Sequence, residues 1–172
     1  QSHSEKHEGR RRSVEIAGSA VDRRFMAAAI AMAERGQGRT GANPPVGCVL
    51  VKHGRVIGRG WTQAGGRPHA EAMALAQASE AASGCTAYVT LEPCAHQSAR
   101  GPAAPARVVA AITDPDPRTA GKGFARLREA GISVETGVLE DAARYGLAGF
   151  LSRIERGRPH VTLKLATSLD GQ

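Results

Sequence analysis

Residues 69–94 read HAEAMALAQASEAASGCTAYVTLEPC, and this stretch decides the fold of the chain. Its first part is dominated by alanine and leucine and predicts a helix over residues 69–82, because both residues have high helix propensity. Residues 86–92 form a short apolar run of strand length, which predicts a buried strand. A helix that leads directly into a buried strand indicates an α/β domain.

The flanking sequence continues this alternation of helix and strand. Asp22 is positioned to cap a helix that ends near Gly36, and His53-Gly54 is a turn signal between two β-branched runs, which predicts a hairpin. The further predicted elements are the hairpin strands 46–51 and 55–60, strands 107–112 and 132–138, and helices 123–130 and 140–156. Hairpin pairing is antiparallel, whereas helical crossovers join parallel strands. The sequence therefore predicts a three-layer α/β/α fold with a mixed central sheet.

Length and charge restrict the class of protein. At 172 residues, with 41% hydrophobic side chains, the chain has the size of one globular domain. Its net charge of +7 is spread, and the only basic run, Arg10-Arg11-Arg12, lies in a polar segment that we expect to be a disordered tail over residues 1–21. Gln1-Ser2 is compatible with a cloning remnant. No apolar run approaches the roughly 18 residues of a membrane span. We therefore expect a cytoplasmic protein without nucleic-acid or membrane partners.

Two short motifs carry the candidate chemistry: His69-Ala70-Glu71 and Glu92-Pro93-Cys94. Together they match most of the zinc deaminase signature, H-x-E followed by P-C-x-x-C, in which zinc activates a water and the glutamate transfers protons. His69 and Cys94 are thus candidate zinc ligands, and Glu71 is the candidate proton shuttle. We expect Cys94 to open a helix, an environment that lowers the pKa of a thiol toward the thiolate that zinc prefers.

Each of these residues also has a simpler interpretation. A lone histidine at a helix start is more often a cap or a surface residue, and a lone cysteine is more often a small buried side chain. The two motifs in combination favour the catalytic interpretation. Cys48 and Cys85 are interpreted as core or strand-end residues, because three cysteines are too few for a disulfide framework.

Four longer segments extend the pattern around these motifs. They are residues 43–48 (NPPVGC), 65–71 (GGRPHAE), 88–96 (YVTLEPCAH) and 114–123 (DPDPRTAGKG). With them the chain resembles, from about Asp22 to Gln172, the deaminase domain of the bifunctional riboflavin-biosynthesis deaminase/reductase family, within the cytidine deaminase-like superfamily. The histidine after Pro-Cys and the Asp-Pro-x-Pro segment with Gly-Lys-Gly are the marks that separate this family from plain cytidine deaminases.

The resemblance implies a reaction and its participants. The reaction is the hydrolytic deamination of the diaminopyrimidinone ribosylamino 5'-phosphate intermediate of riboflavin biosynthesis, with Zn²⁺ as the cofactor, in a domain spanning residues 22–157. His69 and Cys94 are implied as zinc ligands and Glu71 as the proton shuttle. The residues implied in binding the phosphorylated pyrimidine are Asn43, His96, Asp114, Asp116 and Lys122. A loop rich in backbone N–H groups that carries a lysine suits a phosphate. The sequence is also compatible with a homo-oligomer.

The sequence departs from the family pattern at the zinc site. The family has a second zinc cysteine shortly after the Pro-Cys segment, and the cysteine expected after Pro102 is absent here. About ten residues, enough for a short helix, are missing relative to the family. Either a segment is missing from the sequence as given, or the protein has lost a metal ligand. We favour the first interpretation, because the zinc chemistry of the remaining ligands would otherwise be incomplete.

A second departure lies at the C-terminal end. Residues 158–172 resemble the first strand of the family's reductase domain, and the sequence then ends. A single strand cannot form that fold, so NADP(H) is expected as a cofactor only where the native protein has a full reductase domain. The simpler interpretation is an edge strand or a linker of the first domain.

Two alternative functions stay in view. The first is a deaminase for another nucleobase, such as cytidine, guanine or tRNA adenosine, against which Asp114, Asp116 and His96 argue. The second is a zinc-free, catalytically silent binding module, which the absent second cysteine favours. Ammonia release from the riboflavin intermediate separates the proposed enzyme from such a module.

Overall fold

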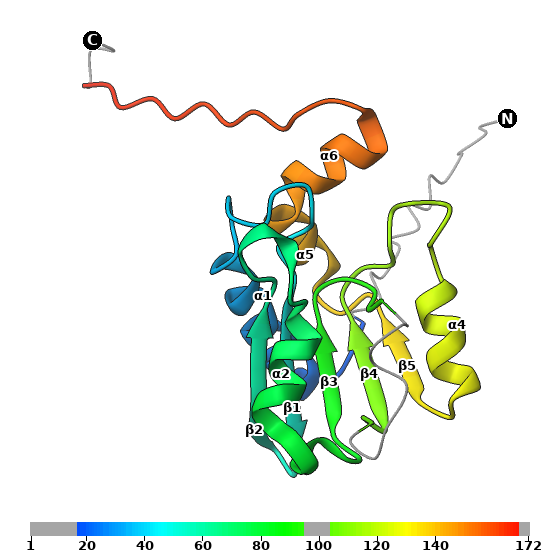
Figure 1. The fold of residues 1–172 in the computed structure, drawn as a ribbon. Helices are drawn as coiled ribbons and strands as arrows, with labels where there is room; N and C mark the ends of the chain where they lie inside the picture. The colour runs from blue at the N-terminus through cyan, green and yellow to red at the C-terminus, as the bar shows by residue number, and fades with distance from the viewer. Residues whose placement is uncertain (1–16, 95–103, 169–172) are drawn as a thin grey trace, which may run out of the picture.

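A mixed five-stranded sheet forms the middle layer of the molecule (Figure 1). The computed structural model describes residues 17–94 and 104–168. The strands are β1 (Gly47–Lys52), β2 (Arg55–Trp61), β3 (Thr86–Val89), β4 (Arg107–Ala110) and β5 (Ser133–Thr136), arranged in the order β2-β1-β3-β4-β5. The pairs β1–β2 and β1–β3 are antiparallel, whereas β3–β4 and β4–β5 are parallel. The predicted hairpin and the predicted mixed sheet are therefore confirmed.

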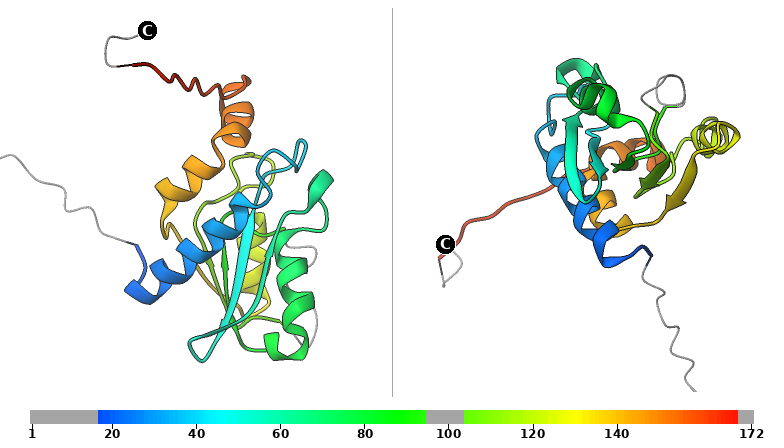
Figure 2. Two further views of the ribbon diagram at one scale, coloured as in Figure 1. Left: turned by 90° about the vertical axis from the view of Figure 1, so that its left-hand side faces the viewer. Right: turned by 90° about the horizontal axis from the view of Figure 1, so that it is seen from below.

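Helices cover both faces of the sheet, as the two rotated views show (Figure 2). The helices α1 (Ala20–Glu34) and α5 (Glu140–Gly146) lie on one face and contact each other. The helices α2 (Ala70–Ala78) and α4 (Lys122–Glu129) lie on the other face. Helix α6 (Ala148–Arg156) lies beyond the C-terminal ends of β3 and β4 (Figure 1). This arrangement is the predicted three-layer α/β/α fold. None of the helices in the described part of the chain is long and apolar enough to cross a membrane.

The start of α1 corrects one prediction. Asp22 does not cap this helix, because Ser19 is the residue that precedes its first turn. The Ser19 hydroxyl oxygen accepts a hydrogen bond from the Asp22 N–H at 3.1 Å, and the Asp22 carboxylate accepts from the Ser19 N–H at 3.1 Å. This reciprocal pair is a capping box, in which the third helical residue supports the capping residue.

Other boundaries also differ from the predicted ones. The helix predicted over 69–82 is α2 followed by a 3₁₀ turn at Ser79–Ala82, and the strand predicted over 86–92 ends at Val89. The single helix predicted over 140–156 is wrong, because Leu147 leaves helical geometry with φ −98° and ψ 9° and separates α5 from α6. Gly146 and Gly149 flank this position, and glycine weakens a helix interior.

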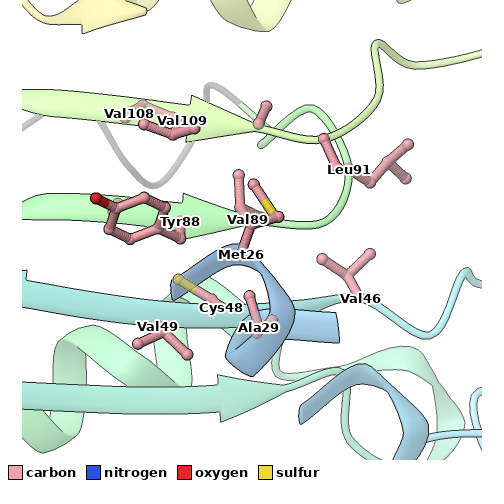
Figure 3. Packing of buried hydrophobic residues seen from close by; sticks show 14 of the residues in the cluster. Met26, Ala29, Val46, Cys48, Val49, Tyr88, Val89, Leu91, Val108 and Val109 are labelled. Atoms are coloured by element: carbon pink, nitrogen blue, oxygen red, sulfur yellow. The ribbon is translucent and has the colours of Figure 1, made fainter. Parts of the chain in front are cut away.

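The core between the sheet and α1 is built from small and branched side chains (Figure 3). Met26 and Ala29 of α1 are fully buried on the sheet face that carries Val49 and its partner Tyr88, whose ring contacts Phe25 of α1. Gly47 permits this close approach, since a Cβ at that position would overlap the backbone oxygen of Ala29. Cys48 and Cys85 are 0% and 1% exposed, which confirms their prediction as core residues. Aromatic side chains are few, so the sheet and helices are held by alanine and valine packing.

A partly buried ion pair ties the first turn of α1 to the sheet. The Asp22 carboxylate accepts two hydrogen bonds from the Arg107 guanidinium, at 2.8 and 3.1 Å, and one from the Tyr88 hydroxyl at 2.8 Å. The Arg107 guanidinium holds the pKa of Asp22 well below its usual range. Burial and the Asp22 carboxylate raise the pKa of Tyr88 to about 12. Tyr88 and Arg107 belong to β3 and β4, so this group joins three elements that are distant in sequence.

The chain leaves the body of the domain after α6. Gly157 ends that helix with φ 64°, and residues 158–168 form no strand or helix. Val161, Leu163 and Leu165 are 82%, 78% and 73% exposed, and the segment extends away from the sheet (Figure 1). The simpler expectation of an added edge strand is therefore wrong for the described residues. The expectation that residues 158–172 begin a reductase domain stays a prediction.

Candidate active site

Loops from four strands and the start of α2 surround one cavity of about 280 Å³. It lies at the sheet edge where β1 begins and where β2, β3 and β4 end. Of the residues predicted from sequence, the cavity is lined by Asn43, His69, Glu71, Cys94, Asp114 and Asp116. Because the ends of neighbouring strands lie side by side at this edge of the sheet, predicted residues as far apart as Asn43 and Asp116 line the same cavity.

His69 is the residue directly before α2, and its side chain makes no capping hydrogen bond. His69 therefore occupies the capping position, as the simpler interpretation expects, but its imidazole does not cap the helix. Burial lowers its pKa, and the nearby Arg67 adds to this effect. A lowered pKa favours the neutral imidazole, which keeps a lone pair for a metal ion. His69 thus lines the cavity in the protonation state that a metal ligand needs.

Glu71 lies in the first turn of α2 and lines the same cavity. Burial raises the pKa of its carboxyl group above the ordinary value. A raised pKa brings the titration of a glutamate closer to neutral pH, where the side chain can both accept and donate a proton. Cys48 lies in the core close to Glu71; burial raises the pKa of its thiol, and the Glu71 charge raises it further. Cys48 therefore remains a protonated core thiol.

Cys94 follows β3 in an exposed loop position, directly after Pro93. The expectation of a lowered thiol pKa is wrong, because desolvation raises it and the charges of Glu71 and Asp114 raise it further. Three carboxylates, the third being Glu92, act on this thiol, and only Arg67 opposes them. These effects favour the neutral thiol, and a bound cation would favour the thiolate. The predicted helix start at Cys94 falls on residues 95–103, outside the described residues.

Asp114 and Asp116 shape the loop between β4 and α4. The Asp114 carboxylate accepts from the Asp116 N–H at 2.9 Å and from the Thr119 hydroxyl at 2.8 Å. Asp116 pairs with Arg118 at 2.6 Å, and this contact lowers the pKa of Asp116 to about 2. Both side chains line the cavity and carry oxygens that can accept hydrogen bonds.

The remaining predicted residues fall in three different places. The carbonyl oxygen of Asn43 accepts from the Thr40 hydroxyl at 2.7 Å, and its side chain lies against Gly66, where no Cβ would fit. Lys122 lines an adjoining hollow of about 150 Å³, which shares Cys94 with the main cavity. His96 lies outside the described residues. The structure thus brings six of the eight predicted residues into one cavity and places Lys122 beside it.

Sequence reasoning assigned no role to several residues of the cavity, although Glu92 belongs to one of the two motifs. Phe150 and Ile154 of α6 supply an apolar wall, and Thr119 and Glu92 supply polar groups. An acidic residue at the end of a buried strand, such as Glu92, is a signal that could have been used, because a buried carboxylate needs partners. The positions of Phe150 and Ile154 have no local signal, since only the break at Leu147 turns α6 over the cavity.

The metal-binding potential of the cavity is incomplete in the described residues. Among residues 17–94 and 104–168, no three histidine, cysteine or acidic side chains are grouped so that they could hold a metal ion. His69 and Cys94 are a nitrogen and a sulfur donor on the same cavity, which is the donor type that zinc prefers. A catalytic zinc site typically has three protein ligands, so these two donors alone would not complete one.

The sequence profile of the family described as the cytidine and deoxycytidylate deaminase zinc-binding region matches residues 19–112, more than half of the chain. The chain belongs to this deaminase family. The matched residues contain His69, Glu71 and Cys94, and the fold around them is the cytidine deaminase-like fold shared with solved deaminase structures.

Within the deaminase family, the chain is similar to riboflavin biosynthesis proteins. It is 48% identical over 158 residues to the riboflavin biosynthesis protein RibD of Escherichia coli, covering 88% of this chain and 43% of that protein. It is 49% identical over 161 residues to RibD of Haemophilus influenzae, covering 90% of this chain and 43% of that protein. The chain thus spans less than half of the length of these curated relatives.

A solved structure of the same kind is similar in three dimensions. Acinetobacter baumannii RibD has a TM-score of 0.78 and 49% identity, over 88% of this deaminase chain and 45% of that chain. A tRNA:A34 deaminase has a TM-score of 0.58 and 29% identity, over 72% of this chain and 99% of that one. Both similarity measures are higher for the RibD structure.

Proposed function

We propose that this chain is a zinc-dependent hydrolytic deaminase that acts on the diaminopyrimidinone ribosylamino 5'-phosphate intermediate of riboflavin biosynthesis. The observation that carries the proposal is the meeting of His69, Glu71 and Cys94 in one cavity, at the end of the sheet. The similarity to RibD proteins supports the choice of substrate. A cytoplasmic location is part of the same proposal.

Zinc would be held by His69 and Cys94. The neutral imidazole and the thiol fit this metal in type, and the carboxylates that raise the pKa of Cys94 make a cation favourable beside it. A third protein ligand would have to come from outside the described residues. When bound, zinc supplies an activated water at neutral pH.

Glu71 would move the protons of the reaction. With a raised pKa it can accept one proton from the attacking water and deliver it to the ring nitrogen, and then transfer the remaining hydroxyl proton to the amino group that leaves as ammonia. Glu71 lies in the first turn of α2, two residues after His69, and lines the same cavity, which supports a role beside the ligand rather than as a ligand. Ammonia leaves and a carbonyl oxygen takes its place on the ring.

The substrate would be bound by polar groups around the base and by a cation near the phosphate. Asn43, Asp114 and Asp116 offer amide and carboxylate groups that can pair with the amino groups and N–H groups of a diaminopyrimidinone. Lys122 in the adjoining hollow would meet the phosphate. Phe150 and Ile154 would pack against the planar ring.

The test is ammonia release from the synthetic intermediate by the full chain supplied with zinc, compared with a Glu71→Gln variant. We expect the variant to keep its zinc and to lose about 10²- to 10⁴-fold in kcat, the range for removal of a general acid–base. Normal turnover by this variant would contradict the role of Glu71. Release of ammonia from cytidine, guanine or tRNA adenosine in place of the intermediate would contradict the substrate.

A second candidate function is a zinc-free binding module, favoured by the two-ligand donor set of the described residues. Intact mass and zinc content of the purified protein separate the two candidates. A mass larger than 17.9 kDa by about ten residues, with one zinc per chain, would support the enzyme. The expected mass with no zinc, and no ammonia release, would support the module. NADP(H) would be a cofactor only of a protein with a complete reductase domain.

A further inference from the structure

The carboxylate of Glu92 accepts four backbone hydrogen bonds from residues far along the chain. Its Oε2 accepts from the N–H groups of Asp114 at 3.0 Å and Gly121 at 2.9 Å. Its Oε1 accepts from those of Gly123 at 2.8 Å and Phe124 at 3.3 Å. Glu92 is only 7% exposed, so water offers little replacement for these charge-assisted bonds.

These bonds join two segments that both line the cavity. Glu92 precedes Cys94 by two residues in the segment that follows β3. Asp114 begins the loop 114–119, which follows β4 and also lines the cavity. The Glu92 N–H also donates to the Ile112 carbonyl oxygen at 2.8 Å. Backbone and side chain of one residue therefore hold the loop 114–119 at its start and beyond its end.

The start of α4 is shaped to meet this carboxylate. The first N–H groups of a helix have no partner within the helix, and they carry partial positive charge that suits an anion. Gly123 lies so close that a Cβ there would overlap the Pro93 carbonyl oxygen and come within 2.9 Å of Glu92 Oε1. A glycine at this position is thus required for the contact between α4 and the segment that carries Cys94.

We propose that Glu92 is a positioning residue for the substrate cavity, where its carboxylate fixes the loop 114–119 and the start of α4 against the Cys94 turn. It acts through the residues it holds rather than on the reacting atoms. The inference rests on the proposed function, because substrate affinity is its main readout.

Replacement of Glu92 by glutamine keeps the shape of the side chain but removes one acceptor. The amide NH₂ would face two N–H donors, so two of the four bonds become repulsive contacts. We expect KM to rise about tenfold or more, because the displaced loop binds substrate. We expect kcat to change less than KM, because Glu71 stays in place on α2.

The experiment compares four full-length proteins supplied with zinc: the wild type, Glu92→Gln, Gly123→Ala and Asp22→Asn. It measures KM and kcat for the intermediate, the melting temperature, and hydrogen exchange of the backbone amides over residues 112–124. Gly123→Ala disturbs the same contact without removing a charge, so it should raise KM in the same way. Asp22→Asn is the matched control, because Asp22 also accepts several hydrogen bonds but contacts Arg107 at the start of β4, the end away from the cavity.

A positioning role predicts a higher KM and faster exchange over 112–124 in both cavity variants, and a lower melting temperature with unchanged KM in Asp22→Asn. If Glu92→Gln does not fold, Gly123→Ala alone decides the result. A lower melting temperature with wild-type KM and wild-type exchange in the cavity variants would overturn the inference and leave Glu92 as a purely structural residue. If the wild type releases no ammonia, the proposed function fails, and the exchange over 112–124 in the two variants decides the positioning role by itself.

Discussion

Replacing Asp22 with asparagine should lower the free energy of unfolding by about 2–3 kcal/mol. Breaking a buried ion pair costs about 3–5 kcal/mol. The Asp22 side chain is 7% exposed, but the Arg107 side chain is 27% exposed and keeps Glu135 as a second partner at 2.8 Å, so we take a value below that range. The asparagine can retain part of the bonds to Ser19 and Tyr88, which also limits the loss.

For a domain of this size, each kcal/mol lowers the melting temperature by about 2–4 °C, so thermal denaturation at pH 7 should show a decrease of about 4–12 °C. The pH dependence is a sharper test. The folded-state pKa of Asp22 is depressed, so its contribution is complete above the unfolded-state value of about 3.9 and is lost as the pH falls through that value toward the folded one. The difference between the wild type and the variant should therefore be full at pH 6 to 7 and shrink below about pH 4.

Glu135→Gln is the matched control on the same guanidinium. The Glu135 side chain is 48% exposed, and an exposed pair contributes less than about 1 kcal/mol. Equal melting temperatures of the wild type and Asp22→Asn would refute the reasoning, as would a decrease in Glu135→Gln as large as that in Asp22→Asn.

Three further predictions concern the cavity. Cys94→Ser should lose zinc measured by atomic emission, whereas Cys85→Ser should keep it, because only Cys94 lines the cavity; equal zinc in both would exclude Cys94 as a ligand. As the pH falls, kcat should decline with an apparent pKa above the ordinary glutamate value of about 4.3, because burial raises the pKa of Glu71 and activity requires its ionised form. An apparent pKa at or below that value would contradict the role of Glu71. Phe150→Ala should raise KM by roughly 5- to 30-fold, equivalent to about 1–2 kcal/mol of lost apolar contact, with little change in kcat; an unchanged KM would remove Phe150 from the substrate wall.

The candidate site divides into residues with local signals and residues without them. His69, Glu71 and Cys94 could be found because their spacing along the chain is itself the signal of the chemistry. Glu92 and Phe150 could not be assigned in this way, since their roles depend on segments that lie 20 or more positions away. The pKa of Cys94 was predicted in the wrong direction for the same reason, because the burial that raises it, and the carboxylates that raise it further, exist only in the folded chain.

The sequence by itself determined the order of helices and strands, the hairpin and the motif-bearing residues, because helix propensity, turn residues and apolar runs act over a few neighbouring positions. The tertiary structure alone decided where these elements end and what they face. The Asp22 carboxylate binds Arg107, a residue 85 positions away, and Leu147 interrupts a helix that its apolar pattern would continue. Such choices depend on the burial and hydrogen-bond partners that distant segments supply, and these exist only once the sheet has formed.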